Sequence, residues 1–66
     1  MKVKNFIKMA MTTINTFVIK DRKGNIIITL FRKDLDNFLP ELERNIHSFT
    51  VESDKYGCPI YAIFVK

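Results

Sequence analysis

Cysteine and histidine are almost absent from this chain of 66 residues, since each occurs once, as Cys58 and His47. A single cysteine excludes a disulfide within the chain, and one cysteine with one histidine is too small a set for a structural zinc site. A lone thiol fits a reducing compartment better than a secreted setting. We therefore expect a cytoplasmic protein that carries no cofactor.

Glycine is scarce as well, and long apolar runs are missing. The two glycines, Gly24 and Gly57, lie too far apart in the chain to build a phosphate-binding loop. The longest apolar runs, 26–31 and 60–65, contain about six residues each, whereas a membrane-spanning helix needs about 18. The sequence therefore predicts neither a phosphate cradle nor a membrane span.

The composition that remains is that of a small globular domain. Hydrophobic residues make up 47% of the chain, which is ordinary for a folded protein. A chain of this size nevertheless buries only about 60% of the surface that it exposes when unfolded. Such domains usually need a disulfide, a metal or a partner chain. With the first two disfavoured, we expect self-association.

Positive charge is concentrated at the N-terminus. The net charge is +4, and Lys2, Lys4 and Lys8 supply three of these charges. From Met9 onward, eight basic residues face seven acidic ones. The body of the domain is thus nearly neutral, and the basic pI alone does not indicate nucleic-acid binding. The same lysines interrupt the apolar N-terminal stretch, which argues against a signal peptide.

Residues 1–11 form an amphipathic segment in which one helical face is apolar and the other carries the lysines. This spacing predicts a short N-terminal helix or basic arm, although an alternating strand pattern is also present. Met9 and Met11 are possible start codons, so that the arm could be an optional extension of a single domain over 12–66. The apolar residues at helical spacing are Val3, Phe6, Ile7, Ala10 and Met11.

Four short segments rich in β-branched and aromatic residues are predicted as strands, at 13–20, 26–31, 48–52 and 60–65. Gly24 can adopt a positive φ in the turn that joins the first two, so these strands form a hairpin. An apolar stripe over 34–46 predicts the main helix. Pro40 lies within it, so this helix begins near Asp36 or kinks.

Together these elements predict a small α+β domain of ββαββ order, with a four-stranded antiparallel sheet and the main helix on one face. Strands that are apolar on both faces belong in the middle of a sheet, and alternating strands belong nearer an edge. The second and fourth strands are apolar throughout, so we expect the order 1-2-4-3. The competing order 2-1-4-3 would put the apolar second strand at an edge and invite aggregation.

The central strands offer more apolar surface than one helix can cover. In the second strand, Ile26, Ile28 and Leu30 share one face, whereas Ile27 and Phe31 share the other. At about 25 cal/mol/Å², leaving several such side chains in water costs several kcal/mol, which is comparable to the stability of a small domain. The N-terminal helix, a second copy or a different protein must cover the second face, and a homodimer is the commonest solution.

We therefore expect a small protein-binding module that is not an enzyme and that acts by stoichiometric binding, as a regulator or inhibitor. Accessory proteins of phages and mobile elements are often of this kind. Its partner would be a protein, and we expect a homodimer. The side chains expected to contact the partner are Phe31, Tyr56, Tyr61, Ile63, Phe6 and Ile7.

A nucleic-acid-binding regulator is the second hypothesis. Basic residues cluster at the hairpin tip and at the far end of the second strand, and they are Lys20, Arg22, Lys23, Arg32 and Lys33. A basic hairpin tip can enter a nucleic-acid groove. No RNA-binding signature accompanies it, and a solvated charged turn is the simpler explanation, so nucleic acid is not the favoured partner.

A small ribonuclease toxin is the third hypothesis, and it would depend on His47, the only ordinary base near neutral pH. A cap at the end of the main helix is the simpler role for this residue. Cys58 is expected to be an inert thiol in a turn. Asp34 and Asp36 are expected to stabilise the start of the helix rather than to bind magnesium.

Overall fold

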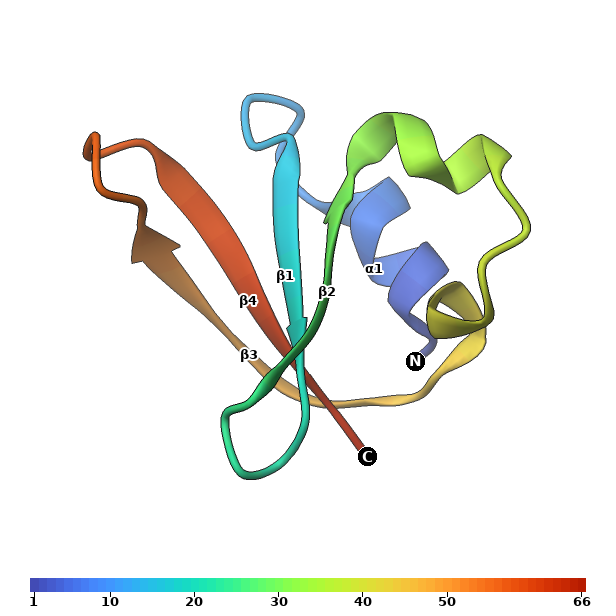
Figure 1. Ribbon diagram of the computed structural model, residues 1–66. Helices are drawn as coiled ribbons and strands as arrows, with labels where there is room; N and C mark the ends of the chain where they lie inside the picture. Colours follow the sequence, from blue (N-terminus) through green and yellow to red (C-terminus); the bar gives the residue numbers. More distant parts are fainter.

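One α-helix, two 3-10 helices and four strands make up the chain, and the computed structural model describes all of residues 1–66. Figure 1 shows the sheet on one side and the helical elements together on the other, which confirms the small α+β class. No helix is long and apolar enough to cross a membrane. In chain order the elements are α1 (Val3–Met9), β1 (Thr16–Lys20), β2 (Ile26–Phe31), η1 (Arg32–Asp36), η2 (Pro40–Glu43), β3 (Ile46–Ser53) and β4 (Pro59–Val65).

The four strands form one mixed sheet in the order β2-β1-β4-β3. β1 and β4 run parallel at the centre, and each pairs antiparallel with its hairpin partner at an edge. The expected order 1-2-4-3 and the expected all-antiparallel pairing are therefore wrong, whereas the third strand does lie at an edge beside the fourth. Phe17, Val18 and Ile19 make the middle of β1 apolar on both faces, and all three are buried. The rule that apolar strands lie in the middle of a sheet therefore fits β1 as well as β2 and does not distinguish the two orders.

The expected main helix over 34–46 does not form. Pro40 lacks an N–H and disfavours helical geometry in the residue before it, and Leu39 is accordingly extended, with ψ of 133°. Asp34 accepts hydrogen bonds from the Phe31 N–H at 2.8 Å and the Asn37 side chain at 3.1 Å, and these local bonds compete with helix formation. The segment therefore breaks into η1 and η2.

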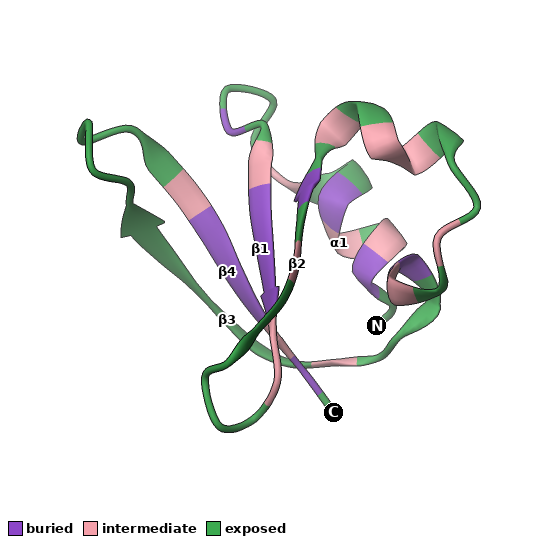
Figure 2. Cartoon of the chain, in the orientation of Figure 1, coloured by how far each residue is buried: buried purple, intermediate pink, exposed green.

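Helix α1 is the element that covers the sheet. Val3 and Ile7 have no exposed surface, and they pack in one core cluster with Phe17, Ile19, Leu30 and Ile63. Figure 2 shows the buried residues gathered in α1 and the two central strands. The start of the chain is also bonded to the segment before β3, because the Val3 N–H donates to Arg44 O at 2.9 Å. Residues 1–11, expected as an arm, thus belong to the same core as the sheet.

The face of the sheet opposite α1 has no covering element within the chain (Figure 1). One row across all four strands consists of Thr29, Val18, Ala62 and Thr50. A register irregularity at the start of β2 leaves Ile27 without a partner and pairs Ile26 with Lys20. Ile26 therefore lies on this face, although it was expected on the same face as Ile28 and Leu30. The same face also carries Phe31 and Phe64, which pair with Thr16 and with Lys20. The face is therefore partly apolar, and the expectation that a partner covers it stays a prediction.

The two hairpin loops are built in the same way. In each loop one aspartate carboxylate, of Asp21 or of Asp54, accepts the backbone N–H groups two and four residues further on, at 2.8–2.9 Å. The fourth residue of each loop is a glycine with positive φ, +91° at Gly24 and +81° at Gly57. These loops turn the chain tightly enough to bring β1 against β2 and β3 against β4.

Candidate functional site

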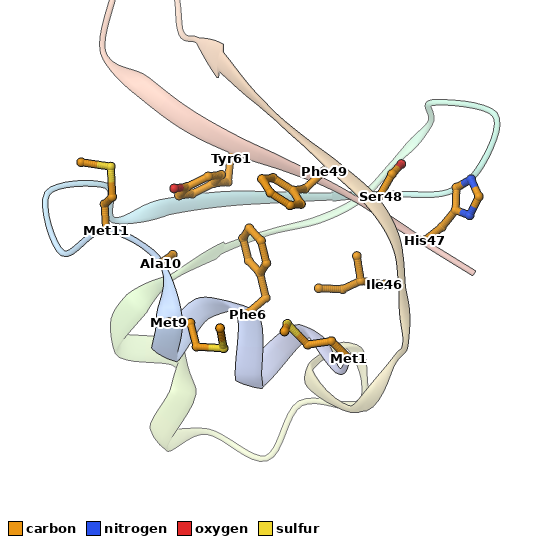
Figure 3. Close-up of a pocket in the computed structure, with 10 residues that line it drawn as sticks. All are labelled: Met1, Phe6, Met9, Ala10, Met11, Ile46, His47, Ser48, Phe49 and Tyr61. Carbon is orange, nitrogen blue, oxygen red and sulfur yellow. The ribbon is translucent and has the colours of Figure 1, made fainter.

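An open apolar groove of about 650 Å³ lies between α1 and the edge strand β3. Figure 3 shows Phe6 from the helix pointing toward Phe49 and Tyr61 of the sheet, with His47 and Ser48 at one end and pointing away from these rings. Eight of its ten lining residues are hydrophobic. We call this feature the methionine groove, and its lining consists of Met1, Phe6, Met9, Ala10, Met11, Ile46, His47, Ser48, Phe49 and Tyr61.

The floor of the methionine groove is a cluster of aromatic rings. Phe6 projects from α1 toward the sheet, where its ring lies 4.7 Å from that of Phe49 and 5.1 Å from that of Tyr61. Tyr61 in turn stacks on Phe17 at 5.7 Å, which ties the floor to the core. Tilted and offset ring pairs of this kind are favourable. The floor is therefore held in place before any partner binds.

The rim of the methionine groove is exposed and consists mainly of unbranched side chains. The exposed fractions of Met1, Met9 and Met11 are 60%, 73% and 63%, and half of Phe49 is exposed as well. Unbranched thioether side chains adapt to irregular surfaces and are common at protein-binding sites. Contiguous exposed apolar surface on a small protein indicates an interaction site. The groove thus combines a fixed floor with an adaptable rim.

The groove stays open because α1 is short. With seven residues, α1 covers the centre of the sheet, but it leaves β3 exposed along nearly its whole length. Figure 2 shows this exposure as a continuous band along the strand. The chain turns extended at Ala10, with ψ of 158°, so no further helical turn reaches over Phe49 or Val51. Both side chains remain more than half exposed.

The outer edge of β3 has backbone groups free to bond another strand. The Asp54 N–H donates to Cys58 O at 2.9 Å, so these two residues are a hydrogen-bonded pair. Along an antiparallel ladder, hydrogen-bonded and non-bonded pairs alternate. Ser53, opposite Pro59, is therefore a non-bonded position, which suits a residue without an N–H. By the same alternation, the N–H and C=O groups of Phe49 and Val51 point away from β4.

The open part of this edge has defined ends. At the start of β3, the Ile46 N–H donates to Met1 O at 2.8 Å, and Lys2 bridges to Asn45, so residues 1–3 occupy the edge there. At the other end, the tight loop begins at Asp54. The open edge therefore consists of residues 47–53, directly beside the methionine groove.

The other edge of the sheet, β2, is protected. The Arg32 N–H donates to Asn15 O at 3.1 Å. Because bonded and non-bonded pairs alternate along the ladder, the N–H of Phe31, the preceding residue, points away from β1. The carboxylate of Asp34 accepts this N–H at 2.8 Å and so blocks that end of the strand. The register irregularity near Ile26 disturbs the other end. These features hinder another strand from pairing with β2, although β2 is apolar and lies at an edge of the sheet.

The residues expected to contact a partner fall into three places. Ile7 and Ile63 are fully buried in the core and offer no surface to a partner. Phe31 and Tyr56 are exposed, but they lie on β2 and on the loop between β3 and β4, apart from the groove. Phe6 and Tyr61 line the methionine groove. The last pair is the part of the expected set that the structure places at the candidate site.

The five basic residues of the nucleic-acid hypothesis do not share one surface. Arg32 donates to three backbone carbonyl oxygens at the end of α1 and in the following loop, at 2.6, 2.7 and 2.7 Å. Lys20 lies 3.6 Å from Glu52 and 5.8 Å from the ring centre of Phe64. Arg22 and Lys23 remain free at the hairpin tip, and Lys33 lies at the opposite end of β2.

The polar groups considered for chemistry are dispersed. His47 is exposed at the end of the groove, and Cys58 is an exposed free thiol in the loop between β3 and β4. Asp34 is engaged with backbone and Asn37, as described above. No three His, Cys, Asp or Glu side chains come together in an arrangement that could hold a metal ion.

The strongest electrostatic feature joins α1 to η2. Glu43 accepts hydrogen bonds from Lys2 at 2.8 Å and Lys4 at 2.7 Å, and these bonds lower the pKa of its carboxyl to about 2. The pKa of Asp21 is also lowered, mainly by the backbone N–H of Asn25. Both groups have structural roles, outside the methionine groove.

Local sequence patterns do not point to the rim of the groove. Met11 was expected on the apolar face of the N-terminal helix, and Met9 was noted as a possible start codon. Phe49 lies in the segment 48–52, which was expected as a strand with alternating polarity. A signal was present, since three methionines in the first eleven residues are many for a chain of this length. Their meaning depends on β3 being left uncovered, which no local pattern shows.

No family model, curated protein or solved structure matches this chain. The groove and the strand edge beside it are therefore the features from which a function can be inferred.

Proposed function

We propose that this chain is a small, non-catalytic protein-binding module that acts by stoichiometric binding through the methionine groove. The observation that carries the proposal is the exposed Met9, Met11 and Phe49 above an aromatic floor that the core holds in place. Burying such side chains against a partner is favourable at about 25 cal/mol/Å². Aromatic and methionine side chains are also enriched at the centres of protein interfaces.

A protein is a better occupant of this groove than a small molecule. Small-molecule sites enclose most of the ligand and place a few polar groups to orient it. Here the groove opens to solvent, and its polar side chains are His47 and Ser48 at one end. The backbone edge of β3 lies alongside, and a partner that carries its own backbone can use this edge.

A regulator or inhibitor is the role that suits a stoichiometric binder. Such a protein needs a rigid surface and no reacting group, and a domain of 7.8 kDa can cover a functional surface of a larger protein. We place it in the cytoplasm, where the exposed thiol of Cys58 would stay reduced. Nucleic acid is the weaker candidate, because Arg32 and Lys20 have partners within the chain.

The test is capture from cells of the source organism, with the wild type and a groove variant compared side by side. In Met9→Glu with Met11→Glu, two exposed rim side chains become charged while the core is untouched. We expect a protein partner to be retained in equal molar amount by the wild type and lost by this variant. The matched control is Arg22→Glu with Lys23→Glu at the hairpin tip.

A partner that the groove variant retains and the hairpin-tip variant loses would contradict the proposal. If that partner were nucleic acid, its release by added salt would identify the electrostatic alternative.

A further inference from the structure

We propose that the occupant of the open β3 edge is a second copy of this chain, paired antiparallel through β3 and centred on Thr50. The inference rests on the proposed function, because it names a partner that extends the methionine groove along β3. Three independent features of the strand support it: the extent of the open edge, the direction of its backbone groups, and the side chains that the pairing brings together.

The extent of the open edge selects the register. The edge is open over residues 47–53, between the stretch occupied by Met1 and the loop that begins at Asp54. Two identical strands that pair antiparallel over their whole open length must meet at its midpoint, which is Thr50. In this register, the loop of each copy begins opposite the point where Met1 of the other copy is bonded to the start of β3. Neither end of the strand therefore obstructs the pairing.

The direction of the backbone groups agrees with this register. Phe49 and Val51 both point their N–H and C=O groups away from β4, as the ladder alternation requires. When the pairing is centred on Thr50, Phe49 lies opposite Val51 of the second copy. Because the N–H and C=O groups of both residues point toward the other copy, the two residues form two hydrogen bonds with each other. The two-fold axis repeats this exchange. Thr50 itself then meets its own copy at a non-bonded position, where the strands approach most closely.

The side chains are complementary in the same register. On the groove face, the half-exposed Phe49 packs against the half-exposed Val51 of the second copy, and an aromatic beside a β-branched residue is a favourable cross-strand pair. On the other face the two Thr50 side chains meet. The one charged side chain of β3 is Glu52, and it lies opposite Ser48 of the second copy. The two Glu52 residues are then separated by four residues of strand, about 13 Å.

The pairing also completes the groove. An axis perpendicular to the sheet keeps α1 of both copies on the same side, so the second copy's Phe49 and Val51 extend the aromatic floor. The two methionine rims then face each other across a trough floored by one continuous sheet. Exposed apolar side chains on β3 become part of a shared surface.

A second copy does not fit the β2 edge in this way. Asp34 occupies the outward N–H of Phe31, and the irregularity near Ile26 disturbs the pairing geometry at the other end. Thr29 is the residue of β2 that corresponds to Thr50, since both belong to the same row across the sheet and both are exposed. It therefore provides a matched control.

The test is disulfide formation at the two-fold axis, in a chain whose only native cysteine is replaced by Cys58→Ser. At a non-bonded antiparallel pair the Cα atoms lie about 4.5 Å apart, which a disulfide can span. We expect Thr50→Cys to link into a covalent dimer under mild oxidation and Thr29→Cys to stay a single chain. Linking through Thr29→Cys instead, or no linking at either position, would overturn the proposal.

A second variant tests the hydrogen bonds without cysteine chemistry. Val51→Pro removes an N–H that faces away from β4, so no bond within the chain is lost, although proline restricts the local φ. In sedimentation, we expect the wild type at twice the 7.8 kDa chain mass and Val51→Pro, with unchanged circular dichroism, at the single mass. A wild type that stays a single chain at every concentration overturns the dimer. The groove proposal is then decided separately by the capture experiment with Met9→Glu and Met11→Glu.

Discussion

Arg32 shows how a single side chain can join elements that the sequence keeps apart. Its guanidinium donates to the carbonyl oxygens of Ile7, Met11 and Ile14, and it lies 5.4 Å from the ring centre of Phe17. Carbonyl groups at a helix end lack intrahelical partners, and a planar cation with several donors suits them. A residue expected to contact nucleic acid thus fastens the end of α1 and the following loop to the start of η1.

Replacement of Arg32 tests this role. We expect Arg32→Ala to lower the free energy of unfolding by about 2 kcal/mol, because charge-assisted hydrogen bonds are lost and carbonyl groups are left unpaired. Arg32→Lys should recover part of this, since one ammonium cannot reach all three oxygens. The measurement is urea unfolding at pH 7. Lys33→Ala, next in the chain but on the surface, should change stability by less than about 0.5 kcal/mol; equal losses for both would refute the structural role.

Glu43 makes stability depend on pH in a predictable direction. Its pKa is about 2 in the folded chain, against a usual 4.5, so the unfolded chain takes up a proton first as pH falls. The stabilisation is therefore complete above pH 4.5 and is lost as pH falls toward 2. Because the ion pairs with Lys2 and Lys4 are exposed, the effect should be modest and should weaken with salt.

The measurement is the melting temperature of wild type and Glu43→Gln between pH 7 and pH 2. We expect the wild type to melt higher near neutral pH and the difference to disappear across the interval between the two pKa values. Since Asp21 is present in both proteins, its own lowered pKa cancels in the comparison. A difference that persists unchanged at the acid end would show that the carboxylate charge is not the cause.

At the scale of elements, α1 matters more than its length suggests. Isolated helices of this size are unstable in water, so packing against the sheet must stabilise it. Its two faces should then respond differently to truncation. We expect Ile7→Ala, at a fully buried position, to cost about 3 kcal/mol. Met9→Ala, on the same helix but 73% exposed, should cost less than about 0.5 kcal/mol.

Urea unfolding of both helix variants gives the comparison directly. Similar costs at the two positions would mean that α1 is not packed on the sheet as described. The same reasoning predicts that a chain without residues 1–10 does not fold, which loss of the circular dichroism signal of the sheet would report.

The hairpin loops form a second pair of matched elements. Gly24 and Gly57 both have positive φ, and an added Cβ would meet nothing within 4 Å at either site. The cost of an alanine is therefore confined to the backbone, at about 1 kcal/mol for each loop. We expect Gly24→Ala and Gly57→Ala to lower the unfolding free energy by similar amounts in urea titrations. A neutral or stabilising effect at either position would contradict the loop geometry.

At the scale of the whole molecule, the sheet has one guarded edge and one open edge. A domain that must avoid aggregation would be expected to guard both. The open edge lies beside the exposed methionines, so the two unsatisfied features occur together. This coincidence favours a binding surface, because a partner there could bury the methionines and bond the strand edge at the same time.

Dimerisation through that edge would make stability depend on concentration. Binding that occurs only in the folded state raises the apparent stability by mass action. We expect the melting temperature of the wild type to rise with chain concentration, and that of Val51→Pro to stay constant. A wild-type melting temperature that does not change with concentration would count against a second copy as the partner.

Local patterns predicted a large part of the fold. The segment 26–31 matches β2, and the turns at Gly24 and Gly57 form where the glycines allow positive φ. The periodicity of the first eleven residues matches α1. The prediction of a main helix over 34–46 was wrong, because it relied on the apolar spacing. Pro40 restricts the backbone of its neighbours by a stereochemical effect that is independent of hydrophobicity.

The candidate site could be predicted only in part. Phe6 and Tyr61 were expected to contact a partner and do line the groove, whereas Ile7 and Ile63 lie in the core. Apolar side chains of similar kind look alike in sequence, and which of them are buried depends on which element covers which strand. The strand order was predicted wrongly for a similar reason, because β1 and β2 are both apolar enough to lie at the centre of the sheet.

By itself, the sequence determined the class of the domain, its hairpins and the helix at its start, because turn chemistry and side-chain periodicity act over a few residues. Tertiary structure alone decided that β1 and β4 pair at the centre, that α1 is the cover, and that β3 is left open beside the methionines. Those outcomes depend on contacts between residues that are distant in the chain, where the short reach of α1 leaves one edge of the sheet unprotected.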